Sequence, residues 1–358
     1  MASLALPALV VLAAEPIYVL VDTAVVGHLG SAPLAALAVG GVVITVATWL
    51  GNVLAYGTTG RSVRRFGAGE RAGAVAEGVQ ASWLALATGV LIAVLAQFLA
   101  GPVAGVLAGG HHDIAAPAAT WLRIAALGAP GLLLATAGNG WLRGVQDTRR
   151  PMAFVLGANA LSAALCPLLV YPAGLGLAGS AVANAAAQTA SGSLFVVALV
   201  RERTPLRPHP ALIRAQLVLG RDLVLRGATF QACFLSATAV VARFGAPALG
   251  AHQIAFQLWN FCSLLLDAVA IAAQALVGAA LGAGDAAGAR ALARRIALAG
   301  LVTGAFLAAV LGGLAGVLPG AFTRDPAVVE RAHVAWPYLV AMQPFAGVVF
   351  ALDGVLIG

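Results

Sequence analysis

Long apolar stretches recur along the whole chain, and short stretches rich in arginine, glycine or proline separate them. A helix needs about 20 largely apolar residues to cross a bilayer, and only a helix satisfies the backbone of such a segment in lipid. Ten segments meet this requirement: residues 4–27, 33–58, 76–100, 116–142, 152–171, 177–200, 219–243, 248–278, 294–317 and 332–356. The pattern therefore predicts an all-α protein that crosses a membrane many times.

Composition supports this prediction and excludes a water-soluble domain. Hydrophobic residues make up 61% of the chain and charged residues only 9%, whereas soluble domains carry about 25% charged residues. The net charge of +7 would otherwise suggest binding to nucleic acid. Because every arginine-rich stretch lies between apolar segments, we expect the partner of this chain to be membrane lipid and not nucleic acid.

The arginines predict the orientation of the segments. Alternate connections are rich in arginine, and the positive-inside rule places these connections in the cytoplasm. Their arginines are Arg61, Arg64, Arg65 and Arg71, then Arg143, Arg149 and Arg150, then Arg201, Arg203, Arg207, Arg214 and Arg221, then Arg290, Arg294 and Arg295. We therefore expect a multi-pass protein of the cell inner (plasma) membrane with a cytoplasmic N-terminus.

An internal repeat organises the segments. The aligned pairs are 66–74 with 281–289, 25–30 with 240–245 and, one residue out of register, 140–144 with 354–358. One such match means little in a chain this rich in glycine and alanine. Three matches in nearly one register indicate a true repeat. The repeat unit contains six segments, an even number, so the two copies should point the same way across the membrane.

The repeat predicts two six-helix bundles, the second of them incomplete. The N-terminal bundle covers residues 1–203. Residues 204–218 form a cytoplasmic linker that contains three prolines. The C-terminal bundle covers residues 219–358 and contains four of the ten helices. We expect the second copy to be truncated by two helices, as a fragment or as a chain that ends early.

Asp22, in the first apolar segment, is the main candidate for ion coupling. Ionisable residues at membrane depth are costly and are functional candidates by default. The alternative is a neutral acid that only hydrogen-bonds to a neighbouring helix. Glu15 lies nearly two turns earlier on the same helix face. Pro16 removes one backbone hydrogen bond and allows a kink, which is either static or part of a protonation-driven switch.

Further polar residues occur inside the apolar segments, where each either joins helices or lines a cavity. They are Asn139, Asn159, Asn184, Gln253, Gln257 and Asn260. The repeat places Asp267 opposite Asn52 and Asp353 opposite Asn139. Both acids are candidates for the transport pathway or for anchoring a helix end.

Nothing in the sequence indicates an enzyme. His111, His112 and Asp113 could bind a metal by composition alone, but they lie in one loop without a fourth ligand. The three cysteines have neither metal-ligand nor disulfide spacing. A membrane-embedded enzyme or a receptor would be the third hypothesis, and it requires a catalytic cluster at one membrane depth that the sequence does not show. We expect no metal site and no cofactor other than a coupling ion.

Several motifs resemble the multidrug and toxic compound extrusion (MATE) family, in its DinF-type branch. Pro7 followed by Leu-Val-Asp-Thr-Ala-Val-Val-Gly-His-Leu-Gly at 20–30 is similar to the first-helix motif of that branch. Leu-Arg-Gly-Val-Gln-Asp-Thr-Arg-Arg-Pro at 142–151 is similar to its cytoplasmic turn after helix four. The segments 174–181 and 353–358 also fit, so the resemblance covers the whole chain.

The resemblance implies two six-helix bundles that face a central cleft. It also implies export of drugs, metabolites or other amphipathic cargo in exchange for H⁺ or Na⁺, with protonation on Asp22. The polar partners of Asp22 would be Asn139, Ser162, Cys166 and Asn184. The branch often has an asparagine and an acid where this chain has Ser162 and Cys166, so Glu15 is the candidate for the missing second acid.

The leading hypothesis is therefore a monomeric secondary exporter of amphipathic or cationic small molecules. It would work by cation antiport and alternating access, with H⁺ more expected than Na⁺. The alternative is a lipid-linked precursor flippase of the same superfamily. A flippase needs a cationic cavity to hold a pyrophosphate, whereas the charges predicted near the membrane midplane are mostly acidic.

Overall fold

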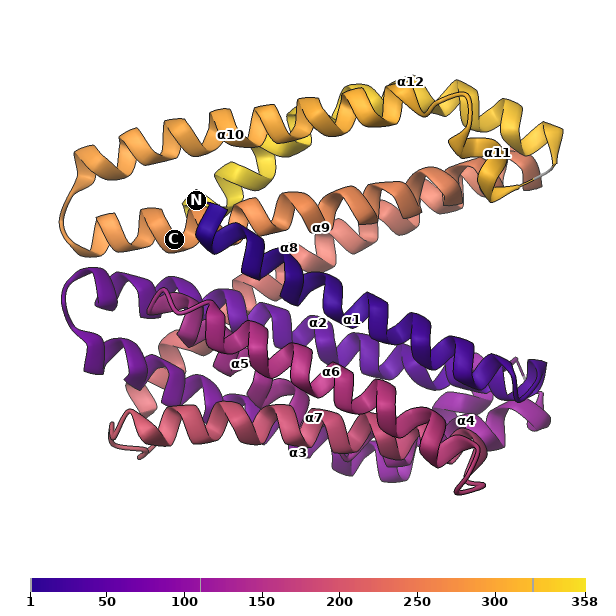
Figure 1. Ribbon diagram of the computed structural model, residues 1–358, viewed down its shortest axis with the longest axis horizontal. Coiled ribbons are helices and arrows are strands. Elements are labelled where there is room, and N and C mark those ends of the chain that lie inside the picture. Colours follow the sequence, from indigo (N-terminus) through magenta and orange to yellow (C-terminus); the bar gives the residue numbers. More distant parts are fainter. Residues whose placement is uncertain (1, 110, 324) are drawn as a thin grey trace. The chain divides into compact units, whose positions relative to one another are not determined.

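The computed structural model describes residues 2–109, 111–323 and 325–358, without the side chains of residues 2–6 and of Glu15. Every regular element in these ranges is an α-helix (Figure 1). The helices are α1 (Ala2–Gly27), α2 (Ser31–Gly67), α3 (Arg71–Leu107), α4 (His112–Ala126), α5 (Ala129–Gly144), α6 (Arg149–Val170), α7 (Gly176–Arg201), α8 (Pro210–Ala242), α9 (Ala246–Gly282), α10 (Ala286–Gly313), α11 (Leu318–Phe322) and α12 (Pro326–Ile357).

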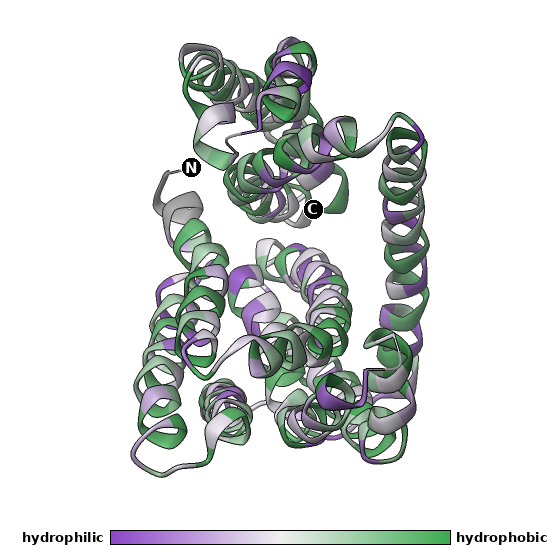
Figure 2. Cartoon of the chain, turned by 90° about the vertical axis from the view of Figure 1, so that its right-hand side faces the viewer, coloured by the Kyte–Doolittle hydropathy of each residue, from purple (hydrophilic) through white to green (hydrophobic). Residues whose placement is uncertain are grey.

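The predicted all-α membrane architecture is confirmed. Nine helices of the described chain are long and apolar enough to cross a membrane, and the bent pair α4 and α5 makes a tenth span. Hydrophobic residues recur along every long helix (Figure 2), and many large apolar side chains are exposed. Phe98 is 74% exposed and Val106 is 81% exposed. Surfaces of this kind are stable against lipid but not against water.

The fourth predicted span, at 116–142, is broken in the structure. Its two parts, α4 and α5, meet at an angle of 49°. The break falls at Leu127 and Gly128, just before Pro130 at the start of α5. Proline lacks the N–H that would continue the hydrogen-bond ladder, and it disfavours helical geometry in the residue before it. The hydropathy pattern did not predict this break, because the residues on both sides of it are apolar.

The chain packs as two compact units, one of residues Val10–Gly220 and one of Met1–Leu9 with Arg221–Gly358. In the first unit α5 packs against α2, α3 and α7, and Trp141 of α5 is fully buried. In the second unit α12 packs against α9 and α10. A Cβ atom on Gly300 of α10 would collide with the carbonyl oxygen of Gly347, so the α10 and α12 backbones touch there.

The repeat is visible in the backbone. The helices α2 and α9 each contain 37 residues, and their ends are offset by 215 residues. The turn before each ends with a left-handed glycine, Gly30 with φ of 119° and Gly245 with φ of 93°. The turn after each contains another, Gly69 with φ of 82° and Gly284 with φ of 77°. Only glycine adopts these angles without strain, so corresponding glycines fix corresponding turns.

Two boundaries differ from those expected. The helix α8 begins at Pro210 and not near residue 219. Proline is well tolerated at the first helical position, and the residues that follow it are good helix formers. Between the ends of α7 and α8, only residues 202–209 are non-helical. The short α11 follows α10 and was not expected from the apolar pattern.

Candidate functional site

Asp22 lies on α1 with its side chain turned into the unit Val10–Gly220. It is 6% exposed, whereas Leu20 two residues earlier is 68% exposed. The acid is therefore on the protein-facing side of an otherwise lipid-compatible helix. A carboxyl group in this position must find its partners within the protein.

Two neighbouring helices supply those partners. The Ser180 hydroxyl of α7 donates a hydrogen bond to Asp22 Oδ1 at 2.7 Å. The Cys166 thiol of α6 donates to the same oxygen at 3.1 Å. The Trp121 indole of α4 in turn donates to Ser180 Oγ at 3.2 Å. Donors from α6 and α7 thus meet at one carboxyl oxygen of α1, and α4 supports one of them.

A second layer of polar groups surrounds Tyr18, which lies one turn before Asp22 on α1. Its side chain is 6% exposed, and Asn184 Nδ2 donates to its hydroxyl oxygen at 3.3 Å. Ser162, which is 1% exposed, lies beside Tyr18. We call Tyr18, Asp22, Ser162, Cys166, Ser180 and Asn184 the Asp22 cluster.

The structure thus brings together four of the residues named from the sequence: Asp22, Ser162, Cys166 and Asn184. Asn139 is also buried, on α5, but its Oδ1 lacks a hydrogen-bond partner. Asn159 on α6 likewise has a buried Nδ2 without a partner. Neither asparagine is hydrogen-bonded to Asp22 among the described contacts.

The predictions for Glu15 and Pro16 stay open. The side chain of Glu15 lies outside the described residues. The helix α1 continues through Pro16 without interruption. Both residues keep their status as predictions from the sequence.

The second unit holds the remaining candidates. Asp267 of α9 is half-buried, and Gln253 and Gln257 are exposed on the same helix. Asp353 of α12 forms an ion pair with Arg226 of α8. This pairing fits the prediction that Asp353 anchors a helix end.

Two grooves in the unit Val10–Gly220 are lined by other residues. The larger, of about 520 Å³, follows α4 and α7 past Leu127, Ala185 and Thr189. The smaller, of about 370 Å³, lies between Thr120 and Trp121 of α4 and Leu177 of α7. Trp121 therefore stands between the smaller groove and Ser180. The predicted cleft residues do not line either groove.

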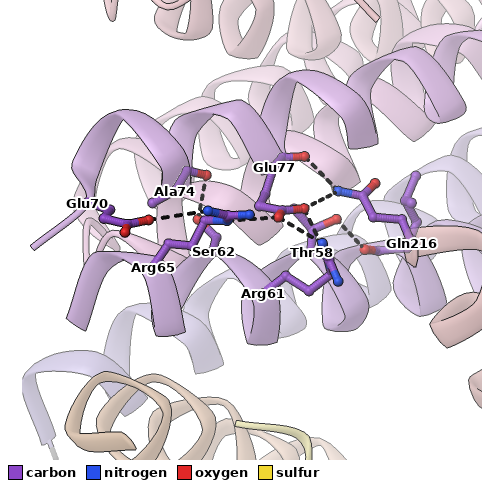
Figure 3. A network of polar contacts seen from close by, with 9 residues as sticks. Thr58, Arg61, Ser62, Arg65, Glu70, Ala74, Glu77 and Gln216 are labelled. Carbon is purple, nitrogen blue, oxygen red and sulfur yellow. Dashed lines mark hydrogen bonds and ion pairs between the residues drawn. The ribbon is translucent and has the colours of Figure 1, made fainter. Parts of the chain in front are cut away.

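A second buried carboxylate lies at one end of α3. Glu77 is fully buried, and Arg61 holds it through two hydrogen bonds, Nε to Oε2 at 2.8 Å and Nη2 to Oε1 at 2.9 Å. Arg65 Nε donates to Oε1 at 3.0 Å, and Gln216 of α8 donates to Oε2 at 3.0 Å (Figure 3). Bidentate guanidinium contacts of this kind are strong and fix geometry.

With this geometry in hand, comparison with known proteins gives the family. The MatE family model matches residues 7–168 and 223–358, both units of the structure. The chain belongs to the MatE family.

Curated relatives agree with this MatE assignment. Protein DETOXIFICATION 44, chloroplastic, of Arabidopsis thaliana is 34% identical over 376 residues, which cover 99% of this chain and 71% of that protein. DNA damage-inducible protein F of Escherichia coli K12 is 32% identical over 290 residues, which cover 78% of this chain and 63% of that protein. The resemblance to the DinF-type branch is therefore confirmed.

Solved structures agree on the MatE fold. A MOP superfamily transporter from Pyrococcus furiosus matches with a TM-score of 0.82 and 20% identity, over 99% of this chain and 83% of that one. A crystal structure of MATE in the bent conformation matches with a TM-score of 0.83 and 20% identity, over 99% and 82%. The protein is a multi-pass membrane protein of a transporter family, and this family does not consist of enzymes.

Sequence reasoning missed several residues of these sites. Tyr18 lies four residues before Asp22, and this helical spacing could have indicated a shared face. Ser180 and Trp121 gave no such signal, because their helices are distant in sequence from α1. Glu77 was missed because it lies at the edge of an apolar segment. Arg61 and Arg65, which are also four residues apart, share a helix face and could have indicated a buried acid as their partner.

Proposed function

We propose that this MatE protein is a secondary exporter that exchanges an amphipathic or cationic small molecule for a cation. The burial of Asp22 among hydrogen-bond donors from α6 and α7 is the observation that carries this proposal. A buried acid whose partners lie on other helices can link its protonation to the packing of those helices. The family membership supports the transport role.

The chemistry of the Asp22 cluster favours H⁺ over Na⁺ as the coupling ion. Hard cations prefer several oxygen ligands. Here the Ser180 hydroxyl and the Cys166 thiol direct their hydrogens at Asp22 Oδ1, and sulfur is a poor ligand for a hard cation. A proton needs only the carboxylate itself.

Protonation would change what Asp22 can bond to. An ionised carboxylate only accepts hydrogen bonds, whereas a protonated one also donates. The donors Ser180 and Cys166 suit the ionised form, so protonation favours a different arrangement of α1 against α6 and α7. Coupling follows if proton and cargo prefer different access states, because each shifts the equilibrium by its differential affinity.

The flippase alternative receives less support from this site. A pyrophosphate headgroup needs basic side chains, and the Asp22 cluster contains none.

We further propose that the protein acts as a monomer in the inner membrane of a bacterial cell, with a cytoplasmic N-terminus.

Efflux from proteoliposomes tests the proposal. The reconstituted protein should move a fluorescent cationic dye under an imposed pH gradient and not under an equal Na⁺ gradient. Asp22→Asn should lower the pH-driven rate about 100-fold. The matched variant Asp113→Asn, at an exposed acid in α4, should leave the rate unchanged. Equal rates for wild type and Asp22→Asn would contradict the role of Asp22.

A further inference from the structure

The chain leaves α7 through a fixed turn. Glu202 bonds to Arg71 of α3 at 3.0 Å and to Arg150 of α6 at 3.4 Å. The next residue, Arg203, has φ of 55°, a left-handed conformation that is uncommon outside glycine. This turn directs the following residues across α3.

Residues 204–216, which we call the strap, lie along one face of α3. Trp83 Nε1 donates to the carbonyl oxygen of Leu206 at 2.8 Å. The Gln80 amide binds the strap backbone twice, since its Nε2 donates to Arg207 O at 3.2 Å and its Oε1 accepts from His209 N at 2.7 Å. The side chain of Gln80 therefore supplies the hydrogen bonds that a helix would have given to the backbone of residues 207 and 209.

Gln216 completes the attachment about one turn earlier on α3, at Glu77. Its Nε2 donates to Glu77 Oε2 at 3.0 Å and to the Glu77 carbonyl oxygen at 2.9 Å. Glu77, Gln80 and Trp83 follow one another at intervals of three residues, so they share a face of α3. Arg61 and Arg65 hold the Glu77 carboxylate in place for this contact (Figure 3).

Polar contacts attach the strap to α3 at each of Glu77, Gln80 and Trp83. Gln216 is the one buried residue of α8, and Leu206 remains 42% exposed. Leu212 and Ile213 are only half-buried, so the apolar surface uncovered if the strap moved away from α3 would be limited. The Gln216 Oε1 atom is buried without a hydrogen-bond partner, a cost that release would remove. This is the composition expected of a contact that opens and closes.

The strap also leads directly into the second unit. The first residues of α8 belong to the unit Val10–Gly220, and from Arg221 onward the same helix belongs to the other. The helix α8 therefore runs without a break from the Gln216 contact into the second unit.

The repeat shows that the helix pair itself does not need these charges. The positions 215 residues after Arg61, Arg65 and Glu77 hold Leu276, Ala280 and Leu292. In the second unit Ala280 and Leu292 pack beside an apolar cluster, and Leu276 is half-buried on α9. The charged group on α2 and α3 is therefore an addition to a shared fold.

We propose that the strap is a latch: Glu77, acting through Gln216, fastens the start of α8 to α3, and the transport cycle opens this contact. The proposal rests on the proposed exporter function. Glu77 and Gln216 are positioning residues, since neither touches the Asp22 cluster.

Hydrogen–deuterium exchange of the purified protein tests the fastening without any transport assay. Gln216→Leu should speed exchange in peptides covering 204–216 about tenfold. Peptides around Asp22 should not change, which also shows that the variant is folded. The matched variant Gln97→Leu, at a glutamine of α3 that bonds to Arg123 O instead, should leave strap exchange as in wild type. Unchanged exchange in Gln216→Leu would overturn the latch.

A reversible crosslink tests the opening. Trp83→Cys with Leu206→Cys, in a Cys233→Ser background, can be joined by a short bis-methanethiosulfonate reagent. Crosslinking should lower the maximal efflux rate about tenfold and leave the cargo KM within about twofold, and dithiothreitol should restore the rate. An unchanged rate in the crosslinked protein would overturn the opening step. Absence of efflux before crosslinking would instead count against the exporter function, and the exchange measurement would still decide the fastening.

Discussion

The helices α1 and α8 stand at corresponding positions of the repeat, yet only α1 presents a buried carboxylate. Asp22 is 6% exposed and bonded to two other helices. The residue 215 positions later is Ala237, which is exposed. Likewise the buried Tyr18 corresponds to the exposed Cys233. The comparison teaches that the proposed coupling chemistry belongs to one copy, while the glycine turns on either side of α2 and α9 belong to both.

The helix pairs α2–α3 and α9–α10 also share their backbone turns and differ in their side chains. Their glycine turns match in φ, but one pair holds the Glu77 ion pairs and the other an apolar cluster. The repeated glycines therefore set the turns between these helices, and the side chains at corresponding positions set the chemistry. Exchanging residues between the copies tests this division.

The largest effect is expected from Asp22→Ala, which gives the first copy the residue of the second. The Asp22 cluster loses its carboxylate, so pH-driven efflux should fall about 100-fold or more in proteoliposomes. The double variant Asp22→Ala with Ala237→Asp should remain inactive, because Ser180 and Cys166 donate to the side chain at position 22 of α1. Recovered efflux in the double variant would break the comparison.

Glu77→Leu should give the next largest effect, on stability. It leaves Arg61 and Arg65 without their buried partner, and breaking a buried ion pair costs about 3 kcal/mol. Thermal unfolding in detergent should show the loss. Adding Arg61→Leu and Arg65→Ala, the residues of the second copy, should recover most of it, since apolar replacement of a whole buried ion pair is often neutral. No recovery in the triple variant would show that the charges are needed for the fold.

Gly300→Ala should have an intermediate effect. The corresponding residue is Ala85, which is fully buried, but Gly300 touches the Gly347 backbone. The added methyl group forces α10 from α12 and should cost about 1–3 kcal/mol in the same unfolding assay. Ala85→Gly should cost only about 1 kcal/mol, the difference in helix propensity. Similar losses for the two variants would argue against closer packing in the second unit.

Asp353→Asn should have the smallest effect. It removes the charge that pairs with Arg226, and the two side chains are 38% and 41% exposed. Exposed pairs contribute about 0–1 kcal/mol, and salt screens them. The unfolding temperature should fall slightly at low salt and not at high salt. A loss of efflux in this variant would place Asp353 in the transport pathway instead.

Much of the fold followed from the sequence, because length and apolarity decide which segments can cross a membrane. The α4–α5 break did not, since Pro102, Pro167 and Pro337 also lie within helices and do not end them. Proline marks a position where a helix can break, and packing decides whether it does.

The Asp22 cluster could be predicted only in part. An acid in an apolar segment is visible in any sequence, so Asp22 stood out. The donors Ser180 and Trp121 are common residues whose role depends on how α4 and α7 pack, and periodicity along one helix does not contain that packing. Gln216 was hidden for the same reason, as its partner Glu77 is 139 residues away.

The Cys166 thiol gives the proposed coupling site a built-in chemical reporter. Its sulfur lies 3.1 Å from Asp22 Oδ1, so a small water-borne thiol reagent can modify it only when water reaches the carboxylate. The other two cysteines calibrate the reaction, since Cys233 is exposed and Cys262 is buried in the other unit. The labelling rate of Cys166 between these limits would follow hydration of the site through the cycle, in the unmodified protein and without a labelled cargo.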